Sequence, residues 1–143
     1  VRLGLEHRVG EWLERTAWLP APGQGALAVV ARADDAETRS FLEPLDHGPT
    51  RAAVRAERTV LEELGGGCQV PIAALGLPFD GGLRLWSLVA SPDGARLVRC
   101  DRTGSGAEPE AVGLEVAEVL KDRGALDILR SVEGAEIPDL THP

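Results

Sequence analysis

A cysteine beside three glycines is the residue whose surroundings most suggest chemistry. Cys68 directly follows Gly65–Gly67, and Pro71 comes three residues later. Glycines have no side chains to shield a thiol, and they let a loop adopt conformations that other residues avoid. A thiol in such a loop is little shielded from other molecules. The residues alone leave a second interpretation open, in which Cys68 is a buried packing residue at the end of a sheet.

The second candidate is a short glycine-rich segment, Gly23–Gly25, in which Gln24 stands between two glycines. It follows a proline-containing loop and precedes an apolar run, so a ligand could approach its backbone closely. The alternative is an ordinary turn that leads into a strand. A strip of three arginines, Arg51, Arg55 and Arg58, could bind carboxylates, although such strips are more often simply solvated.

The other cysteine and the histidines do not predict a site. Cys100 falls within an expected strand, without a turn or glycine cluster beside it, and we expect it to be buried and structural. No CxxC pair and no Cys/His spacing typical of zinc occurs, so no metal site is predicted. The histidines are dispersed, at His7, His47 and His142. A redox function would need Cys68 and Cys100 to act as a pair, which a reducing cytoplasm disfavours.

Hydrophobic periodicity and turn residues predict the elements that must position these groups. A helix over 51–64 has a broad apolar face, with Thr50 as its N-cap and Gly65–Gly67 at its end. Three strands then follow at 70–77, 83–90 and 95–102, and turns that contain Asp-Gly join them. Two further helices are predicted at 108–123 and 125–132. This order predicts an α+β fold, a three-stranded antiparallel sheet with helices on one face.

The first 45 residues predict separate elements. Apolar residues recur at every fourth position early in the chain, which predicts a short helix over 3–15. The apolar run 26–31 has the length of a strand that is buried on both faces. A second helix is expected from a cap at Asp34 or Asp35 to about Leu45. Its apolar side chains are expected to face inward, namely Phe41, Leu42 and Leu45.

The charge balance excludes some classes of partner. The 143 residues carry 15 Lys+Arg and 23 Asp+Glu, a net charge of −8, and 43% of them are hydrophobic. This acidity argues against nucleic-acid binding, and no apolar run is long enough to span a membrane. The excess of acidic residues is uneven along the chain. Residues 101–143 have four basic and ten acidic side chains, whereas residues 51–100 have six basic and five acidic ones. With two cysteines only, we expect a cytoplasmic protein.

Four segments resemble the porphobilinogen deaminase family, also called hydroxymethylbilane synthases. They are Arg2–Glu6, Leu19–Leu27, Ala56–Arg58 and Leu64–Ile72. Their order and spacing agree with the family, and the Leu-x-Gly-Gly-Cys-x-Val-Pro pattern around Cys68 is highly specific. The resemblance covers essentially the whole chain and is weakest beyond residue 103.

The resemblance implies a transferase that condenses four porphobilinogen molecules head-to-tail, with release of ammonia, into hydroxymethylbilane. The family cysteine that matches Cys68 carries a dipyrromethane cofactor through a thioether. Arg2 matches an arginine that holds acetate and propionate side chains, and Gln24 and Gly25 match residues that line the cofactor site. No catalytic residue is carried over, because the family's catalytic aspartate belongs to the N-terminal region.

The resemblance also implies that this chain is the C-terminal portion of a three-domain protein. Residues 1–25 would end the second α/β domain, residues 26–47 would return to the first as a strand and a helix, and residues 48–143 would form the cofactor-bearing domain. The first two domains resemble periplasmic-binding-protein lobes, so only remnants of them are expected. Without the missing N-terminal domains we expect no activity. The alternative is a stand-alone binding or structural domain with an unmodified Cys68.

Overall fold

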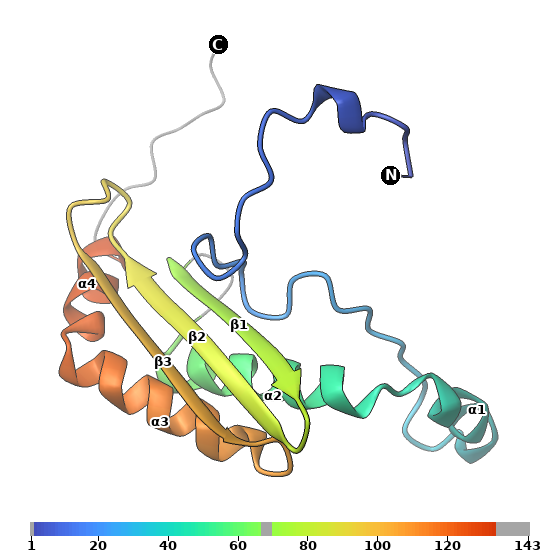
Figure 1. The fold of residues 1–143 in the computed structure, drawn as a ribbon. Helices are drawn as coiled ribbons and strands as arrows, with labels where there is room; N and C mark the ends of the chain where they lie inside the picture. The colour runs from blue at the N-terminus through green and yellow to red at the C-terminus, as the bar shows by residue number, and fades with distance from the viewer. Residues whose placement is uncertain (1, 67–69, 134–143) are drawn as a thin grey trace.

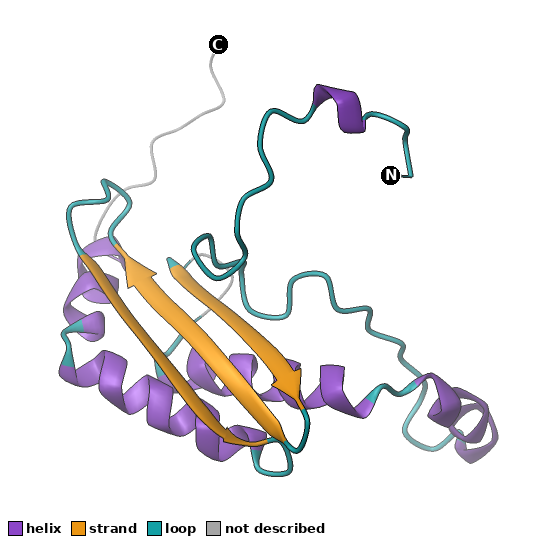
Figure 2. Cartoon of the chain, viewed as in Figure 1, coloured by secondary structure: helices purple, strands orange, loops and turns teal. Residues whose placement is uncertain are grey.

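The computed structural model describes residues 2–66 and 70–133 of the chain (Figure 1). An N-terminal segment with little regular structure precedes a sheet that is covered by helices (Figure 2). In order, the elements are a 3-10 turn at Glu6–Arg8, α1 at Ala36–Leu42, a 3-10 turn at Glu43–Leu45, α2 at Gly48–Glu63, β1 at Ile72–Phe79, β2 at Gly82–Ala90, β3 at Leu97–Ser105, α3 at Pro109–Asp122 and α4 at Ala125–Glu133. The expected α+β fold is confirmed.

The three strands form an antiparallel sheet with β2 in the centre. Leu75 of β1 lies opposite Trp86 of β2, which in turn lies opposite Asp101 of β3. Side chains alternate between the two faces of a strand, so every second residue of β2 points into the core. The fully buried ones include Leu83, Leu85, Ser87 and Val89. The expected meander is therefore confirmed, with β1 and β3 displaced by two or three residues toward the C-terminus.

Helices α2, α3 and α4 cover one face of the sheet, and the core lies between these two layers (Figure 1). All the buried hydrophobic residues of the described chain lie between Ala53 and Leu129. Apolar burial is the main source of folding free energy, so this part of the chain holds its own stabilising core. We call residues 48–133 the helix–sheet unit.

Two glycines bring helix α2 close to both of its neighbours. A Cβ atom added at Gly76 of β1 would lie 3.0 Å from the Cα atom of Ala53. One added at Gly113 of α3 would lie 2.7 Å from the carbonyl oxygen of Ala56. Protein interiors are packed to nearly crystalline density, so neither position has room for a larger side chain. Helix α2 thus packs closely against both the sheet and its neighbour α3.

Helix α2 starts earlier than the sequence predicts. Instead of Thr50, the N-cap is His47, whose Nδ1 accepts a hydrogen bond from the backbone N–H of Thr50 at 3.4 Å. Gly48 is the first helical residue, and Pro49 lies in the first turn. Proline is favourable there, because an N–H in the first turn has no partner within the helix. The end of the helix before Gly65 is as predicted.

Two predicted elements of the N-terminal segment are wrong. In place of the helix over 3–15, the structure has only the 3-10 turn at Glu6–Arg8. The stretch 26–31 forms no strand, and Leu27 and Val30 are 95% and 88% exposed. Short helices and single strands need a surface to pack against. No described residue supplies that surface, so the apolar pattern alone does not produce the element.

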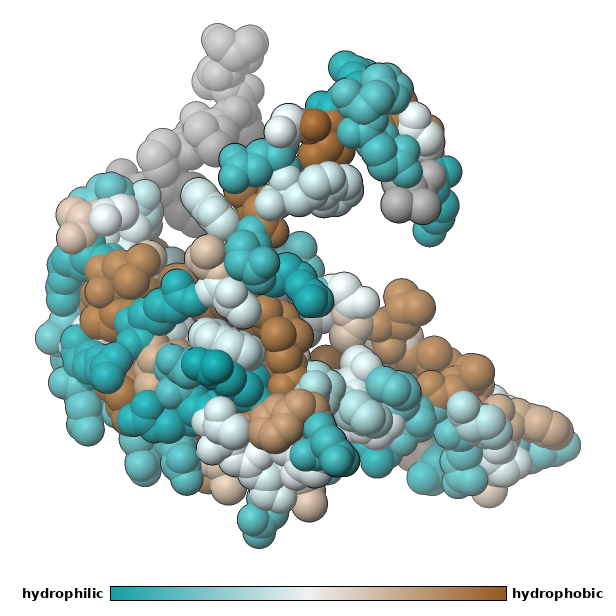
Figure 3. Space-filling view, in the orientation of Figure 1, coloured by the Kyte–Doolittle hydropathy of each residue, from teal (hydrophilic) through white to brown (hydrophobic). Residues whose placement is uncertain are grey.

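The helix expected from a cap at Asp34 or Asp35 to about Leu45 starts as predicted, with Asp35 as the cap, but α1 ends at Leu42 and the 3-10 turn at Glu43–Leu45 takes the place of its last turn. The Asp35 carboxylate accepts a hydrogen bond from the backbone N–H of Thr38 at 3.0 Å and caps α1. Its apolar residues do not face inward as expected, since Phe41 and Leu45 are 74% and 66% exposed. Figure 3 shows apolar surface along the projecting arm that ends in α1. No helix within 2–66 or 70–133 has the length and apolarity needed to cross a membrane.

Replacing Gly113 with alanine tests the contact between α2 and α3. The added methyl group would approach the Ala56 carbonyl oxygen and the Thr59 Cβ atom to 2.7 and 2.6 Å, so the helices would have to separate. Alanine gains about 1 kcal/mol of helix propensity, but overpacking typically costs about 1–3 kcal/mol. Both contacts are shorter than 3.0 Å, so we expect a cost near the upper end of this range and a net loss of about 2 kcal/mol in the free energy of unfolding of Gly113→Ala, measured by urea titration.

Gly48→Ala is the matched control, because a Cβ atom at this first residue of α2 would meet nothing within 4 Å. We expect its free energy of unfolding to be unchanged or slightly higher. A Gly113→Ala chain as stable as the unsubstituted one would show that α2 and α3 are not in close contact.

Candidate functional site

A carboxylate buried in helix α2 joins two segments that are distant in the sequence. Glu57 lies on the apolar face of α2 and is 6% exposed. Its Oε1 accepts a hydrogen bond from the backbone N–H of Gly76 in β1 at 2.7 Å. Its Oε2 accepts one from the backbone N–H of Gly23 at 2.6 Å. The glycine-rich segment predicted from the sequence is thus bonded directly to the interior of the helix–sheet unit.

Burial raises the pKa of Glu57 above the usual value of 4.5. Desolvation is the largest cause, and the hydrogen bonds from Gly76 and Gly23 act in the opposite direction without cancelling it. An ionised carboxylate loses more on leaving water than two backbone N–H groups return. The charged side chain is therefore retained at some cost to folding stability.

Residues Pro20–Ala26, here called the linker turn, form a compact structure at the edge of β1. The backbone N–H of Gln24 donates to the carbonyl oxygen of Ala21 at 3.0 Å. The side-chain oxygen of Gln24 accepts a hydrogen bond from the backbone N–H of Ala21 at 3.2 Å. The backbone N–H of Ala74 in β1 donates to the carbonyl oxygen of Pro20 at 3.0 Å. The turn is closed by its own hydrogen bonds and attached to the edge strand.

An open hollow of about 1130 Å³ lies beside the linker turn. Its walls are the outer face of α2, the stretch between Ala26 and Ala33, and the region of α1. The arginines that line it are Arg39, Arg51 and Arg58. Arg51 forms an ion pair with Asp46. No ion pair joins Arg58 to another described residue, so its guanidinium could receive a carboxylate from a ligand.

The described residues do not bring the predicted cofactor-site residues together. Cys68 lies outside the described part of the chain, which stops at Gly66 and resumes at Val70. Gln24 and Gly25 lie in the linker turn, where Gly25 lines the hollow. Arg2 is exposed and is not among the lining residues, and the nearby 3-10 turn at Glu6–Arg8 lies apart from the sheet (Figure 1). The assignment of these four residues to a cofactor site stays a prediction.

Cys100 is buried, as expected, with 4% of the residue exposed. Its Sγ lies 3.7 Å from the carbonyl oxygen of Asp101. Burial is the main cause that raises the pKa of this thiol, and a thiol that stays protonated is a poor nucleophile. Its structural role is therefore the one predicted from the sequence.

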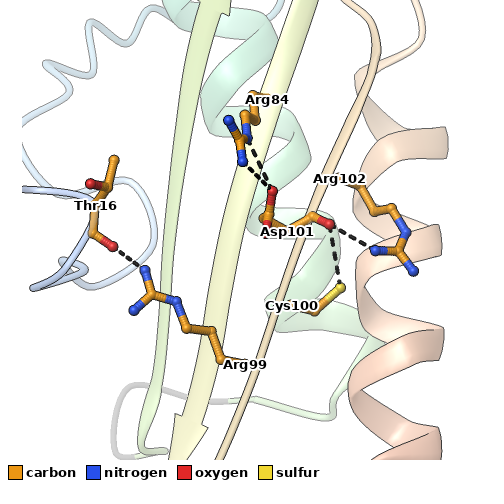
Figure 4. A network of polar contacts seen from close by, with 6 residues as sticks. All are labelled: Thr16, Arg84, Arg99, Cys100, Asp101 and Arg102. Atoms are coloured by element: carbon orange, nitrogen blue, oxygen red, sulfur yellow. Dashed lines mark hydrogen bonds and ion pairs between the residues drawn. The ribbon is translucent and has the colours of Figure 1, made fainter.

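The uncovered face of the sheet carries a charged network (Figure 4). Arg84 of β2 forms an ion pair with Asp101 of β3 at 2.7 Å, and its guanidinium carbon lies 4.6 Å from the ring centre of Trp86. Arg99 donates a hydrogen bond to the carbonyl oxygen of Thr16. Half-exposed ion pairs contribute little free energy. Within the network, the hydrogen bond from Arg99 to Thr16 attaches the N-terminal segment to β3.

No role was predicted for Glu57 from the sequence, although a glutamate on the apolar face of a helix is itself informative. It lies between Ala53, Ala56 and Val60, which are buried on the same face of α2. A carboxylate at such a position needs hydrogen-bond partners, because burying it unpaired is costly. These partners are backbone N–H groups, which every residue but proline has, so the sequence could not identify them.

Two protein-family models match the chain, one over the helix–sheet unit and one over the N-terminal segment. Residues 51–122 match the family model described as "Porphobilinogen deaminase, C-terminal domain". Residues 1–40 match the model described as "Porphobilinogen deaminase, dipyromethane cofactor binding domain". The chain belongs to the porphobilinogen deaminase family, and the family predicted from the motifs is confirmed.

Three curated relatives, each named porphobilinogen deaminase, are similar over most of the chain. The protein of Desulforudis audaxviator (strain MP104C) is 53% identical over 131 residues, which are 92% of this chain and 42% of the relative. That of Ralstonia nicotianae is 45% identical over 144 residues, 98% of this chain and 43% of the relative. That of Paraburkholderia phytofirmans is 44% identical over 140 residues, which are 96% of this chain and 41% of the relative. The chain thus spans about two fifths of the length of these relatives.

The raised pKa of Glu57 predicts a pH-dependent contribution to stability. The folded chain binds a proton at Glu57 more tightly than the unfolded chain does. Its contribution to the free energy of unfolding therefore falls as the pH rises from 4.5 through the raised pKa, and is level above it. Glu57→Gln has no proton to titrate, so we expect it to lack this fall in urea titrations between about pH 4 and 8.

Glu62→Gln is the control, because it removes a carboxylate from an exposed position of the same helix. It should keep the pH dependence of the unsubstituted chain. If Glu57→Gln and the unsubstituted chain lose stability in parallel as the pH rises, the pKa of Glu57 is not raised by burial.

Proposed function

We propose that this chain is the C-terminal part of an enzyme with porphobilinogen deaminase activity. That activity is a transferase reaction of tetrapyrrole and haem biosynthesis, in which four porphobilinogen molecules are condensed into hydroxymethylbilane with release of ammonia. The observation that carries the proposal is the family match in both parts of the chain, together with 44–53% identity to three relatives over 92–98% of it. We place the enzyme in the cytoplasm.

The proposal includes a dipyrromethane cofactor joined to the Sγ atom of Cys68 by a thioether. The described residues on both sides of the cysteine support an anchored attachment point. The backbone N–H of Gly66 donates to the carbonyl oxygen of Leu61, and that of Ile72 to the carbonyl oxygen of Val70, each at 2.8 Å. When bound, the cofactor supplies the pyrrole carbon to which the first substrate is added.

Two arginines that line the hollow, Arg39 and Arg58, are in no ion pair with another described residue and could bind carboxylates of a ligand. We assign Arg2 to acetate and propionate groups, since a guanidinium binds a carboxylate in a fixed, two-pronged geometry. We assign Gln24 and Gly25 to the lining of the cofactor site. The support is that Gly25 and Arg58 line the same hollow. A role for Arg2 there requires residues 2–15 to pack differently once the rest of the enzyme is present.

The partners of the N-terminal segment would be the missing N-terminal domains. Residues 1–25 would then end the second α/β domain, residues 26–47 would return to the first, and residues 48–143 would form the third. The support is the apolar surface of the segment, including Leu27 and Val30. Contiguous apolar surface of this kind marks an interaction site. We propose neither nucleic acid nor a membrane as a partner.

A stand-alone binding or structural domain with an unmodified Cys68 is the second candidate. The observation in its favour is that the buried hydrophobic residues all lie between Ala53 and Leu129, so the helix–sheet unit has a core without the N-terminal domains. The two candidates differ in whether Cys68 carries an adduct and whether the chain supports turnover.

Complementation tests the proposed activity. The chain would be co-expressed with the N-terminal domains of the Desulforudis audaxviator relative, and porphobilinogen consumption measured. We expect turnover by the pair, none by this chain alone, and none by the pair with Cys68→Ala. Cys100→Ala is the control, since that thiol is buried and structural. Full activity with Cys68→Ala would refute the role of Cys68, and turnover by this chain alone would refute the need for the N-terminal domains.

Mass spectrometry tests the covalent attachment separately. In the co-expressed protein we expect an added dipyrromethane mass that peptide mapping places on the peptide containing Cys68. Ehrlich's reagent should give a colour that is lost in Cys68→Ala. A bare Cys68 in a pair without turnover would favour the stand-alone domain.

A further inference from the structure

We propose that Glu57 is a positioning residue that fixes the linker turn to the helix–sheet unit and so sets the direction in which the N-terminal segment leaves it. This inference goes beyond the proposed function. It concerns how the chain holds Gln24 and Gly25 in place, and it stands or fails whether or not these residues bind a cofactor.

The first argument is the geometry of the carboxylate. Its two oxygens accept hydrogen bonds from two different segments, Gly76 at 2.7 Å and Gly23 at 2.6 Å. The hydrogen bond to Gly76 fixes the carboxylate within the interior of the unit. The other oxygen is then directed at the linker turn, where it accepts from a backbone N–H. Among side chains, a carboxylate has two oxygen atoms that can each accept a hydrogen bond, and the length of glutamate lets one oxygen reach each amide.

The second argument is energetic. Glu57 lies among the buried apolar residues of α2, and burial raises its pKa, so the charge does not serve the packing of the core. A buried charge can often be replaced by apolar side chains without loss of stability. The contact that only a carboxylate provides here is the second hydrogen bond, to Gly23. This contact accounts for a glutamate at a position where alanine or valine would pack.

The third argument is where the N-terminal segment is attached. Within the described chain, the hydrogen bonds from residues 2–45 to the helix–sheet unit are confined to Thr16, Pro20 and Gly23. Pro20 accepts from Ala74 on the edge of β1, and Thr16 accepts from Arg99. Gly23 provides the attachment nearest to residues 26–45. Loss of the hydrogen bond to Glu57 would leave that side of the turn without an anchor.

Hydrogen exchange measured by NMR on the 143-residue chain tests this role. We expect Glu57→Gln and Glu57→Asp to speed exchange of the Gly23 amide by about tenfold, because that amide loses its charge-assisted hydrogen bond to Glu57. The Ala74 amide should exchange faster as well, because it donates to Pro20 of the linker turn, which this hydrogen bond holds in place. Glutamine offers one acceptor oxygen, and aspartate is one methylene too short to reach both amides. The core amides of Leu85 and Val89 should exchange as before.

Glu62→Gln, on the same helix but exposed, should leave all of these amides unchanged. A pH titration gives a second readout. In the unsubstituted chain the amide shifts of Gly23 and Gly76 should change with one shared midpoint above 4.5, and this shared transition should vanish in Glu57→Gln.

Two results would overturn the proposal. If Gly23 and Ala74 exchange at the same rate in Glu57→Gln as in the unsubstituted chain, the linker turn is held without the carboxylate. If all amides speed up together, including those of Leu85 and Val89, Glu57 supports the global fold and has no special role at the turn. Neither result depends on porphobilinogen turnover, so the proposed function is tested independently.

Discussion

The close packing of helix α2 against β1 and α3 is the constraint on which the rest of the structure depends. The helix can approach both neighbours because Gly76 and Gly113 face it without side chains. This contact places Glu57 within reach of β1 and, through the linker turn, of the N-terminal segment. The same helix ends just before the connection that carries Cys68. One well-packed element thus holds the linker turn through Glu57 and precedes Cys68 in the sequence.

The helix–sheet unit could be predicted from the sequence because its apolar patterns are satisfied within the chain. The three strands, α3 and α4 fall close to their expected bounds. The elements predicted for residues 3–15 and 26–31 do not form, because the apolar residues of these two segments have no partner within the described chain and remain exposed. Periodicity shows that a segment can pack, but the packed element also requires a surface to pack against.

The candidate site was less predictable than the fold. Motifs identified Cys68, Gln24, Gly25 and Arg2 through a family resemblance, but the geometry of the linker turn depends on a hydrogen bond between Glu57 and Gly23, which are 34 residues apart. Backbone donors carry no side-chain signature, so no pattern in the sequence pairs them with a particular carboxylate. The signal that was present, a glutamate on an apolar helix face, indicates a partner without identifying it.

The exposed apolar residues of the arm that ends in α1 have a thermodynamic consequence. Any partner that covers Leu27 and Val30 and binds the folded arm in preference to the unfolded one stabilises the folded arm by mass action. The stability of this arm is then a property of the partner's concentration as well as of the sequence. The helix–sheet unit, whose core is complete, has a melting temperature independent of that concentration unless the partner also binds the unit itself.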